Sequence, residues 1–123
     1  MKENNFKEQF YQRIYKYGLI IIRLVESLLK DQTSKILGNQ LLRSGTSVVA
    51  NIIEAKSASS KKDYVNFYQH ALKSANESKL CICYLRDANK IEEKQSKEIL
   101  GETNEIANIL AASIITMKNK RKI

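Results

Sequence analysis

Apolar residues recur every three or four positions along most of this chain, the spacing that places them on one face of an α-helix. Short polar segments interrupt the pattern, and the clearest of them is 57–60, Ser-Ala-Ser-Ser. The pattern predicts helices over residues 5–30, 34–56, 61–88 and 92–117. Four helices of similar length with short connections predict an all-α fold, an antiparallel up-down-up-down four-helix bundle that forms a single domain, 1–123.

Capping residues and a glycine refine this prediction. Asp31 precedes the second helix, and Ser60 with Asp63 forms a variant of the capping box at the start of the third. Gly18 lies inside the first helix, where it lowers helix stability, so we expect a close approach of another helix there. The third helix is expected to bury Tyr64, Phe67, Ala71, Leu72, Ala75, Ser78, Ile82 and Leu85.

The helix expected over 34–56 is apolar on two opposite sides, whereas a helix on the surface of a monomeric bundle needs one apolar stripe. The first helix also carries an outward stripe beside its core face. Scattered apolar surface residues are normal, but two aligned stripes favour a homo-oligomer. We predict subunit contacts through Tyr11, Tyr15, Ile22, Leu42, Val49 and Ile53.

The amino-acid composition narrows the possible fold, location and chemistry of the protein further. The chain has no proline and four glycines, which excludes turn-rich β folds. The amino-terminal segment has no secretory pattern and no apolar run is long enough to span a membrane, so we expect a cytoplasmic protein with no membrane partner. Cys81 and Cys83 point to nearly opposite sides of one helix and cannot pair there. Two thiols with the single histidine, His70, do not make a metal site.

The net charge of +8 comes from 21 basic and 13 acidic residues. Rows of basic residues can follow a phosphate backbone without reading base sequence, so we predict non-specific binding of RNA or another nucleic acid. The alternative is that the charge only keeps the protein soluble, and that it acts as an interaction scaffold or accessory subunit. The residues predicted to bind nucleic acid are Lys16, Arg23, Lys30, Lys61, Lys62, Lys79, Arg86, Lys90, Lys118, Lys120, Arg121 and Lys122.

A polar cluster is expected between the second and third helices, with Arg43 paired to Glu54 or Glu77 and partly out of solvent. A catalytic site would need two carboxylates, or a base beside a nucleophile, facing a cleft. Neither arrangement is evident, and His70 is expected near the core boundary as a packing residue. We therefore predict no catalytic residue, no cofactor and no enzyme activity, with a structural cluster of Arg43, Asn51, Glu54, Ser74 and Glu77.

Several of these segments together resemble a known family. They are 41–44 (Leu-Leu-Arg-Ser), 47–54 (Ser-Val-Val-Ala-Asn-Ile-Ile-Glu), 60–64 (Ser-Lys-Lys-Asp-Tyr) with Phe67, and Ala71 with Ser74 and Glu77. Nearly the whole chain is similar to the bacterial four-helix-bundle proteins encoded in intervening sequences of large-subunit ribosomal RNA genes. The resemblance implies a ring-like homopentamer. It also implies kinship with accessory proteins of diversity-generating retroelements, basic barrels that bind nucleic acid and a reverse transcriptase.

Three positions depart from the family pattern. Val49 stands where a proline is common, Ala55 follows Glu54 where a glycine is usual, and Lys73 with Ser74 replaces Gly-Ser. These residues favour straight helix ends and keep the core pattern, so they leave the expected fold unchanged. They put a function based on loops in doubt.

Overall fold

The structure, a computed structural model, describes residues 2–121 and the side chains of residues 5–120. It consists of α1 (Lys2–Ser27), α2 (Gln32–Ala55), α3 (Lys61–Asp87) and α4 (Glu93–Arg121), and no strand occurs in this part of the chain. The four-helix, all-α prediction is confirmed. The observed helix ends differ from the expected ones by a few residues.

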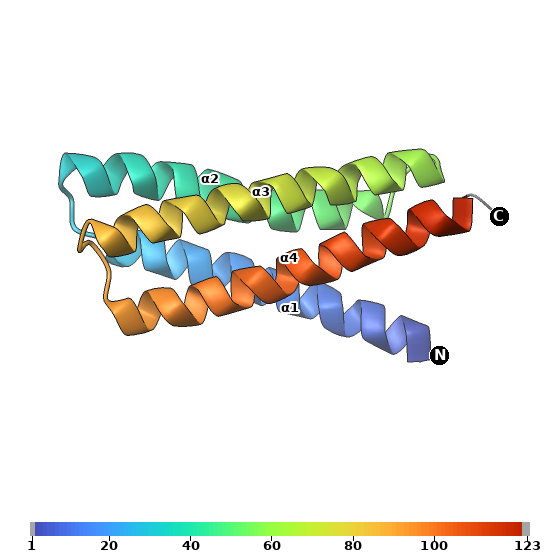
Figure 1. Ribbon diagram of the computed structural model, residues 1–123, viewed down its shortest axis with the longest axis horizontal. Coiled ribbons are helices and arrows are strands. Elements are labelled where there is room, and N and C mark those ends of the chain that lie inside the picture. The colour runs from blue at the N-terminus through green and yellow to red at the C-terminus, as the bar shows by residue number, and fades with distance from the viewer. Residues whose placement is uncertain (1, 122–123) are drawn as a thin grey trace.

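Figure 1 shows how the helices are arranged. Both chain ends and the connection from α2 to α3 lie at one end of the molecule, which we call the terminal end; the other two connections lie at the opposite end. Helix α3 packs against both α2 and α4, and α1 packs mainly against α2. Helices α1 and α4 touch only over a short stretch and diverge toward the terminal end.

In α1 the residues Ile14, Tyr17 and Ile21, which recur every three or four positions, are almost completely buried. In α3 the prediction was partly wrong, because Val65 and Tyr68 are buried although neither was expected in the core. The expected Tyr64, Phe67 and Leu72 are half-buried. Since α3 contacts helices on two sides, its buried face is wider than the single stripe that the sequence suggested.

Glycines allow α1 and α2 to approach closely, as expected at Gly18. A Cβ added at Gly18 would lie 3.2 Å from Cγ2 of Val49, and one added at Gly45 would lie 2.8 Å from Cγ2 of Ile21. Both glycines are buried. A residue larger than glycine at position 18 or 45 would therefore collide with the side chain of Val49 or Ile21.

Side-chain caps fix the starts of α2 and α3. The carboxylate of Asp31 accepts the N–H of Ser34 at 2.9 Å, a bond that lowers the pKa of Asp31. The hydroxyl of Ser60 accepts the N–H of Asp63 at 3.1 Å, as expected. The return bond of the capping box is displaced by one residue, because the Asp63 carboxylate accepts the N–H of Ser59 at 3.1 Å.

Candidate nucleic-acid interface

The basic residues predicted on the first helix are exposed. Lys16 and Arg23 lie on α1, but α1 ends at Ser27, so Lys30 belongs to the connection that follows rather than to the expected helical stripe. Among the described residues none of the three has a carboxylate within ion-pair distance. Their charges are available to a ligand in solution.

Lys79, Arg86 and Lys90 were expected to form one basic row along the third helix, and two of the three form ion pairs. Arg86 donates from Nε to the Asp87 carboxylate at 2.8 Å, and Lys90 Nζ lies 3.5 Å from Oδ2 of Asp31. The chain leaves α3 through Asn89, whose φ of 61° is left-handed, and Lys90 therefore follows the helix rather than extending its row. Lys79 alone of this row has no carboxylate partner among the described residues.

Lysines gather at the terminal end, because helices far apart in sequence start or stop there (Figure 1). Lys61 and Lys62 open α3, and Lys118 and Lys120 lie near the end of α4. All four are exposed. Two lysines that the sequence did not single out join them, Lys7 near the start of α1 and Lys56 after α2. The side chain of Arg121 and the whole of Lys122 lie outside the described residues.

A cleft of about 730 Å³ lies among α1, α3 and α4 at the terminal end, where α1 and α4 diverge. Aromatic side chains and lysines contribute to it, and no carboxylate does among the side chains that the structure describes. Its lining comprises Phe6, Lys7, Phe10, Tyr11, Tyr64, Tyr68, Ile109, Ala112, Ser113, Thr116, Met117 and Lys120.

Within this cleft Tyr64 and Tyr68 stack with ring centroids 4.8 Å apart, and the Tyr64 hydroxyl donates to that of Tyr68 at 3.1 Å. Burial raises the pKa of Tyr68. Beside it, Lys56 Nζ lies 3.8 Å from the centroid of the Tyr11 ring, a cation–π contact. Sequence reasoning treated Tyr64 as an ordinary core residue, since the divergence of α1 and α4 that opens the cleft leaves no mark in the hydrophobic pattern.

The residues predicted to make subunit contacts divide into two groups. Tyr15 and Ile53 are exposed, by 64% and 41%, and Ile22 and Leu42 are half-buried. Tyr11 and Val49 are also half-buried and pack against the core cluster of the same chain, so only part of each side chain is left for a second subunit. Val49 is partly covered because its side chain packs against Gly18, where α1 and α2 approach each other closely.

The two outward stripes flank the same helix pair. Lys56 contacts Tyr11, and Val49 reaches Gly18, so Tyr15 on α1 and Ile53 on α2 lie at matching levels between these contacts. Both side chains stand out into solvent in this chain. We call the part of α1 and α2 that carries Tyr15 and Ile53 the apolar strip; other exposed apolar side chains, such as Tyr84 on α3, lie elsewhere.

The polar cluster differs from its prediction. Arg43 is exposed, and no described Arg43 atom forms an ion pair with Glu54 or Glu77. Glu54 and His70 are exposed as well, so the expected position of His70 at the core boundary was wrong. The predicted buried pair is absent because Arg43 reaches water at the edge of a shallow groove of about 410 Å³, which Ser74 and Glu77 also line.

Small hydroxyl groups replace the expected ion pair between α2 and α3. The Ser44 and Ser78 hydroxyls are 2.8 Å apart, Ser74 donates to the Ser47 hydroxyl at 3.1 Å, and the Asn51 amide donates to the Ser47 carbonyl at 2.9 Å. Hydroxyl pairs of this size let two helices lie close together while their polar atoms stay bonded. The contacts that the structure shows for Ser74 and Asn51 are hydrogen bonds between uncharged groups.

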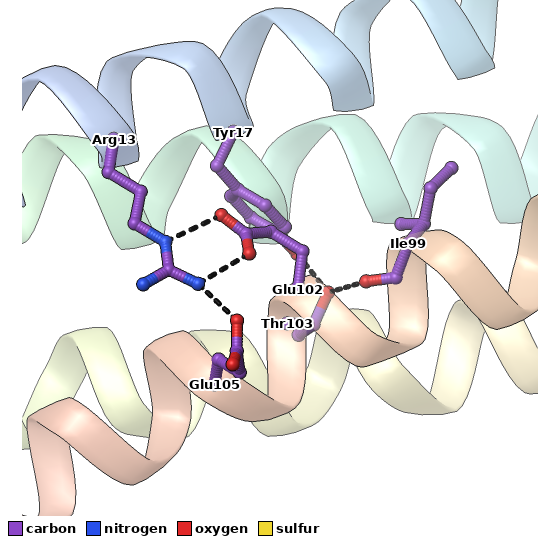
Figure 2. Close-up of polar contacts among 6 residues, drawn as sticks. All are labelled: Arg13, Tyr17, Ile99, Glu102, Thr103 and Glu105. Atoms are coloured by element: carbon purple, nitrogen blue, oxygen red, sulfur yellow. Dashed lines mark hydrogen bonds and ion pairs between the residues drawn. The ribbon is translucent and has the colours of Figure 1, made fainter.

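An ion-pair network that sequence reasoning missed joins α1 to α4 (Figure 2). Arg13 donates to Glu102 through Nε at 2.8 Å and Nη2 at 2.6 Å, and its Nη2 also contacts Glu105. The hydrogen bonds from Arg13 lower the pKa of Glu102. One turn along, Tyr17 and Thr103 share a buried hydrogen bond of 2.7 Å. Each charge by itself looks like part of a solvated surface, so no local signal indicated the pairing.

Comparison with known proteins decides the family. Residues 7–112 match the family model described as 23S rRNA-intervening sequence protein. The chain belongs to this family. The family resemblance drawn from segments 41–44, 47–54 and 60–64 is thereby confirmed, since all of them lie within the matched range.

A solved structure is also similar to this intervening-sequence protein. It is a protein of unknown function from the S23 ribosomal protein family of Bacteroides thetaiotaomicron, 33% identical in sequence, with a TM-score of 0.80. The similarity covers 85% of this chain and 96% of that one. No curated protein matches the chain.

The described residues contain no candidate metal centre and no membrane-spanning helix. They include no group of three or more histidine, cysteine or acidic side chains placed to hold a metal ion. None of their helices is both long enough and apolar enough to cross a membrane.

Proposed function

We propose that this protein is a non-enzymatic, homo-oligomeric helical bundle that binds RNA or DNA without sequence specificity, through contacts of lysine and arginine with phosphates. The observation that carries the proposal is the set of exposed basic residues without carboxylate partners among the described residues. Among the residues predicted to bind nucleic acid, they are Lys16, Arg23, Lys30, Lys61, Lys62, Lys118 and Lys120. Such charges release counterions from nucleic acid when they bind it, which favours association at low salt.

Assembly belongs to the same proposal. The apolar strip along α1 and α2 leaves Tyr15 and Ile53 exposed, which suits contact with a second copy of the chain. In this proposal each copy is an antiparallel up-down-up-down bundle. By family resemblance the assembly is a ring-like homopentamer. A ring repeats each row of lysines around one particle, so individually weak phosphate contacts act together on one nucleic-acid molecule.

A second candidate is an interaction scaffold or accessory subunit that does not touch nucleic acid, with a reverse transcriptase as the partner that the retroelement kinship implies. The ion pairs of Arg86 and Lys90 favour it, because they show that part of the positive charge is neutralised within the chain. The free cysteines Cys81 and Cys83 suit either candidate in a reducing cytoplasm.

Fluorescence polarisation separates these candidates. The purified protein is titrated into labelled RNA and DNA of unrelated sequences at low salt, and the titration is repeated at high salt. The proposal predicts binding of both nucleic acids that differs little between sequences and weakens steeply with salt. Absence of binding at low salt would overturn it in favour of the scaffold.

A further inference from the structure

The aromatic cleft at the terminal end is more specific than the basic surface around it. We infer that it binds an unpaired nucleotide of a single-stranded nucleic acid, with the base against the aromatic rings and the adjacent phosphates near Lys7 and Lys120. This inference rests on the proposed function and names the part of the nucleic acid that the cleft takes.

Aromatic side chains at the mouth of the cleft suit a base. Phe6 is 61% exposed although it lines the cleft, whereas Phe10, which lines it as well, is buried beside it. An exposed phenylalanine ring leaves water when a base stacks on it, and every base has a face that can stack. Tyr64, half-buried and hydrogen-bonded to Tyr68, adds a fixed aromatic wall.

Charge at the cleft suits a phosphate. Lys7 and Lys120 line it from α1 and α4, and Lys56 lies over the ring of the lining residue Tyr11. Among the described residues, the carboxylates Glu8, Glu54 and Asp63 also lie toward the terminal end, but none of them lines the cleft. A ligand with an aromatic portion and a negative portion therefore meets complementary surfaces in one place, which an uncharged apolar segment would not use.

Size and access favour a single strand over a duplex. The cleft volume of about 730 Å³ lies in the range of sites that enclose small organic molecules and is sufficient for a nucleotide. Bases of a duplex are stacked on one another and their faces cannot reach a side chain, whereas unpaired bases can turn out of the strand. The cleft therefore adds a preference for unpaired strands to a surface that otherwise binds phosphates of any nucleic acid.

The test compares a labelled oligoadenylate with its duplex, formed with oligouridylate, by polarisation at one salt concentration. The Phe6→Ala variant is expected to bind the single strand roughly 5- to 100-fold more weakly than the parent protein, the loss of one stacked base. Its affinity for the duplex should stay unchanged. Tyr84→Ala is the matched control, because Tyr84 is similarly exposed, at 56%, and does not line the cleft.

A second measurement reports on the cleft directly. The chain contains no tryptophan, so a Phe6→Trp variant carries a single indole at the mouth of the cleft. Saturating oligoadenylate should change the intensity or the maximum of the indole emission of this variant. The duplex should change the emission much less. Lys120→Gln should weaken binding of the single strand more than Lys94→Gln, a change of equal charge at the other end of α4.

The outcomes separate the cleft inference from the proposed function. If the parent protein binds both nucleic acids but Phe6→Ala matches Tyr84→Ala, the cleft inference is overturned and the proposed function stands. If the parent protein binds neither, the proposed function fails and the cleft inference with it. If the emission maximum of Phe6→Trp shifts as the protein concentration rises without nucleic acid, a second copy fills the cleft. That result also overturns the inference.

Discussion

Arg13 of α1 and Glu102 of α4 form a two-pronged ion pair, with Nε and Nη2 of the guanidinium bonded to the two carboxylate oxygens at 2.8 and 2.6 Å. These two helices touch over a shorter stretch than any other packed pair. The ion pair and the adjacent Tyr17–Thr103 bond therefore fix the point where α1 and α4 cross, beyond which they diverge to open the aromatic cleft. Polar contacts between side chains thus set the geometry of the terminal end.

Removing the Arg13 pair should destabilise the fold moderately. The two side chains are 36% and 26% exposed, so water screens them, and we expect Arg13→Gln to lower the free energy of unfolding by about 1 kcal/mol. Urea unfolding followed by circular dichroism measures it. Arg86→Gln is the control, because Arg86 pairs with its exposed neighbour Asp87, and it should cost much less. Equal losses of stability would show that the pair between α1 and α4 has no special weight.

The contribution of Glu102 should depend on pH. Arg13 lowers the folded-state pKa of Glu102 below its usual value of 4.5, so the carboxylate stabilises the fold at pH values above about 4.5. That stabilisation is lost as the pH falls through the lowered pKa, because protonation then removes the ion pair. The difference in unfolding free energy between the parent protein and Glu102→Gln should be constant near pH 7 and shrink as the pH falls below about 4.5. A difference that grows on acidification would contradict the assignment.

Glycine substitutions should have opposite effects at two helical positions. In Gly45→Ala the new Cβ would lie 2.8 Å from the fully buried Ile21, and the resulting overpacking should cost about 1–3 kcal/mol, more than the roughly 1 kcal/mol that alanine adds to helix stability. Gly101 is exposed with no atom within 4 Å of an added Cβ, so Gly101→Ala should stabilise by about 0.5–1 kcal/mol. Melting temperatures of both variants test the contrast, and stabilisation by both would refute the close packing of α1 on α2.

The sequence predicted the helices and most of the core because burial on one helix face repeats with the helical period. It also predicted the close approach at Gly18, since an interior glycine in a helix needs a reason. It could not predict the partner of Arg13, which lies 89 residues away in sequence on another helix. The same limit misplaced Arg43, because a row of charges on one helix does not reveal whether the neighbouring helix leaves room for water.

The candidate nucleic-acid interface shows most clearly that contacts between helices cannot be predicted from the pattern of one helix. Lys61 and Lys118 were predicted to bind nucleic acid. Lys7 and Lys56 were not, because each stands alone in the sequence. Their gathering depends on which helix ends meet, a property of topology. Tyr11 and Val49 were predicted to make subunit contacts only, because a wheel drawn for one helix does not show that a neighbouring helix of the same chain covers part of each side chain.

Self-association should depend on the exposed part of the apolar strip. Tyr15→Glu combined with Ile53→Glu places charges on two exposed side chains outside the core, so the variant should keep its helical circular dichroism and lose the oligomer. Light scattering measures the mass of both proteins. A parent protein that is monomeric at micromolar concentration would contradict the proposed assembly, as would a double variant whose mass equals that of the parent oligomer.

The salt dependence of nucleic-acid affinity tests the central claim most directly. Measured across a salt series, the logarithm of the association constant should fall linearly with that of the salt concentration, with a slope that reflects how many phosphates the protein neutralises. The Lys118→Gln/Lys120→Gln variant should flatten the slope by about one for each phosphate that it no longer neutralises, whereas Lys94→Gln/Lys97→Gln, equal in charge on the same helix, should change it less. A slope near zero, or no binding at low salt, would contradict the account.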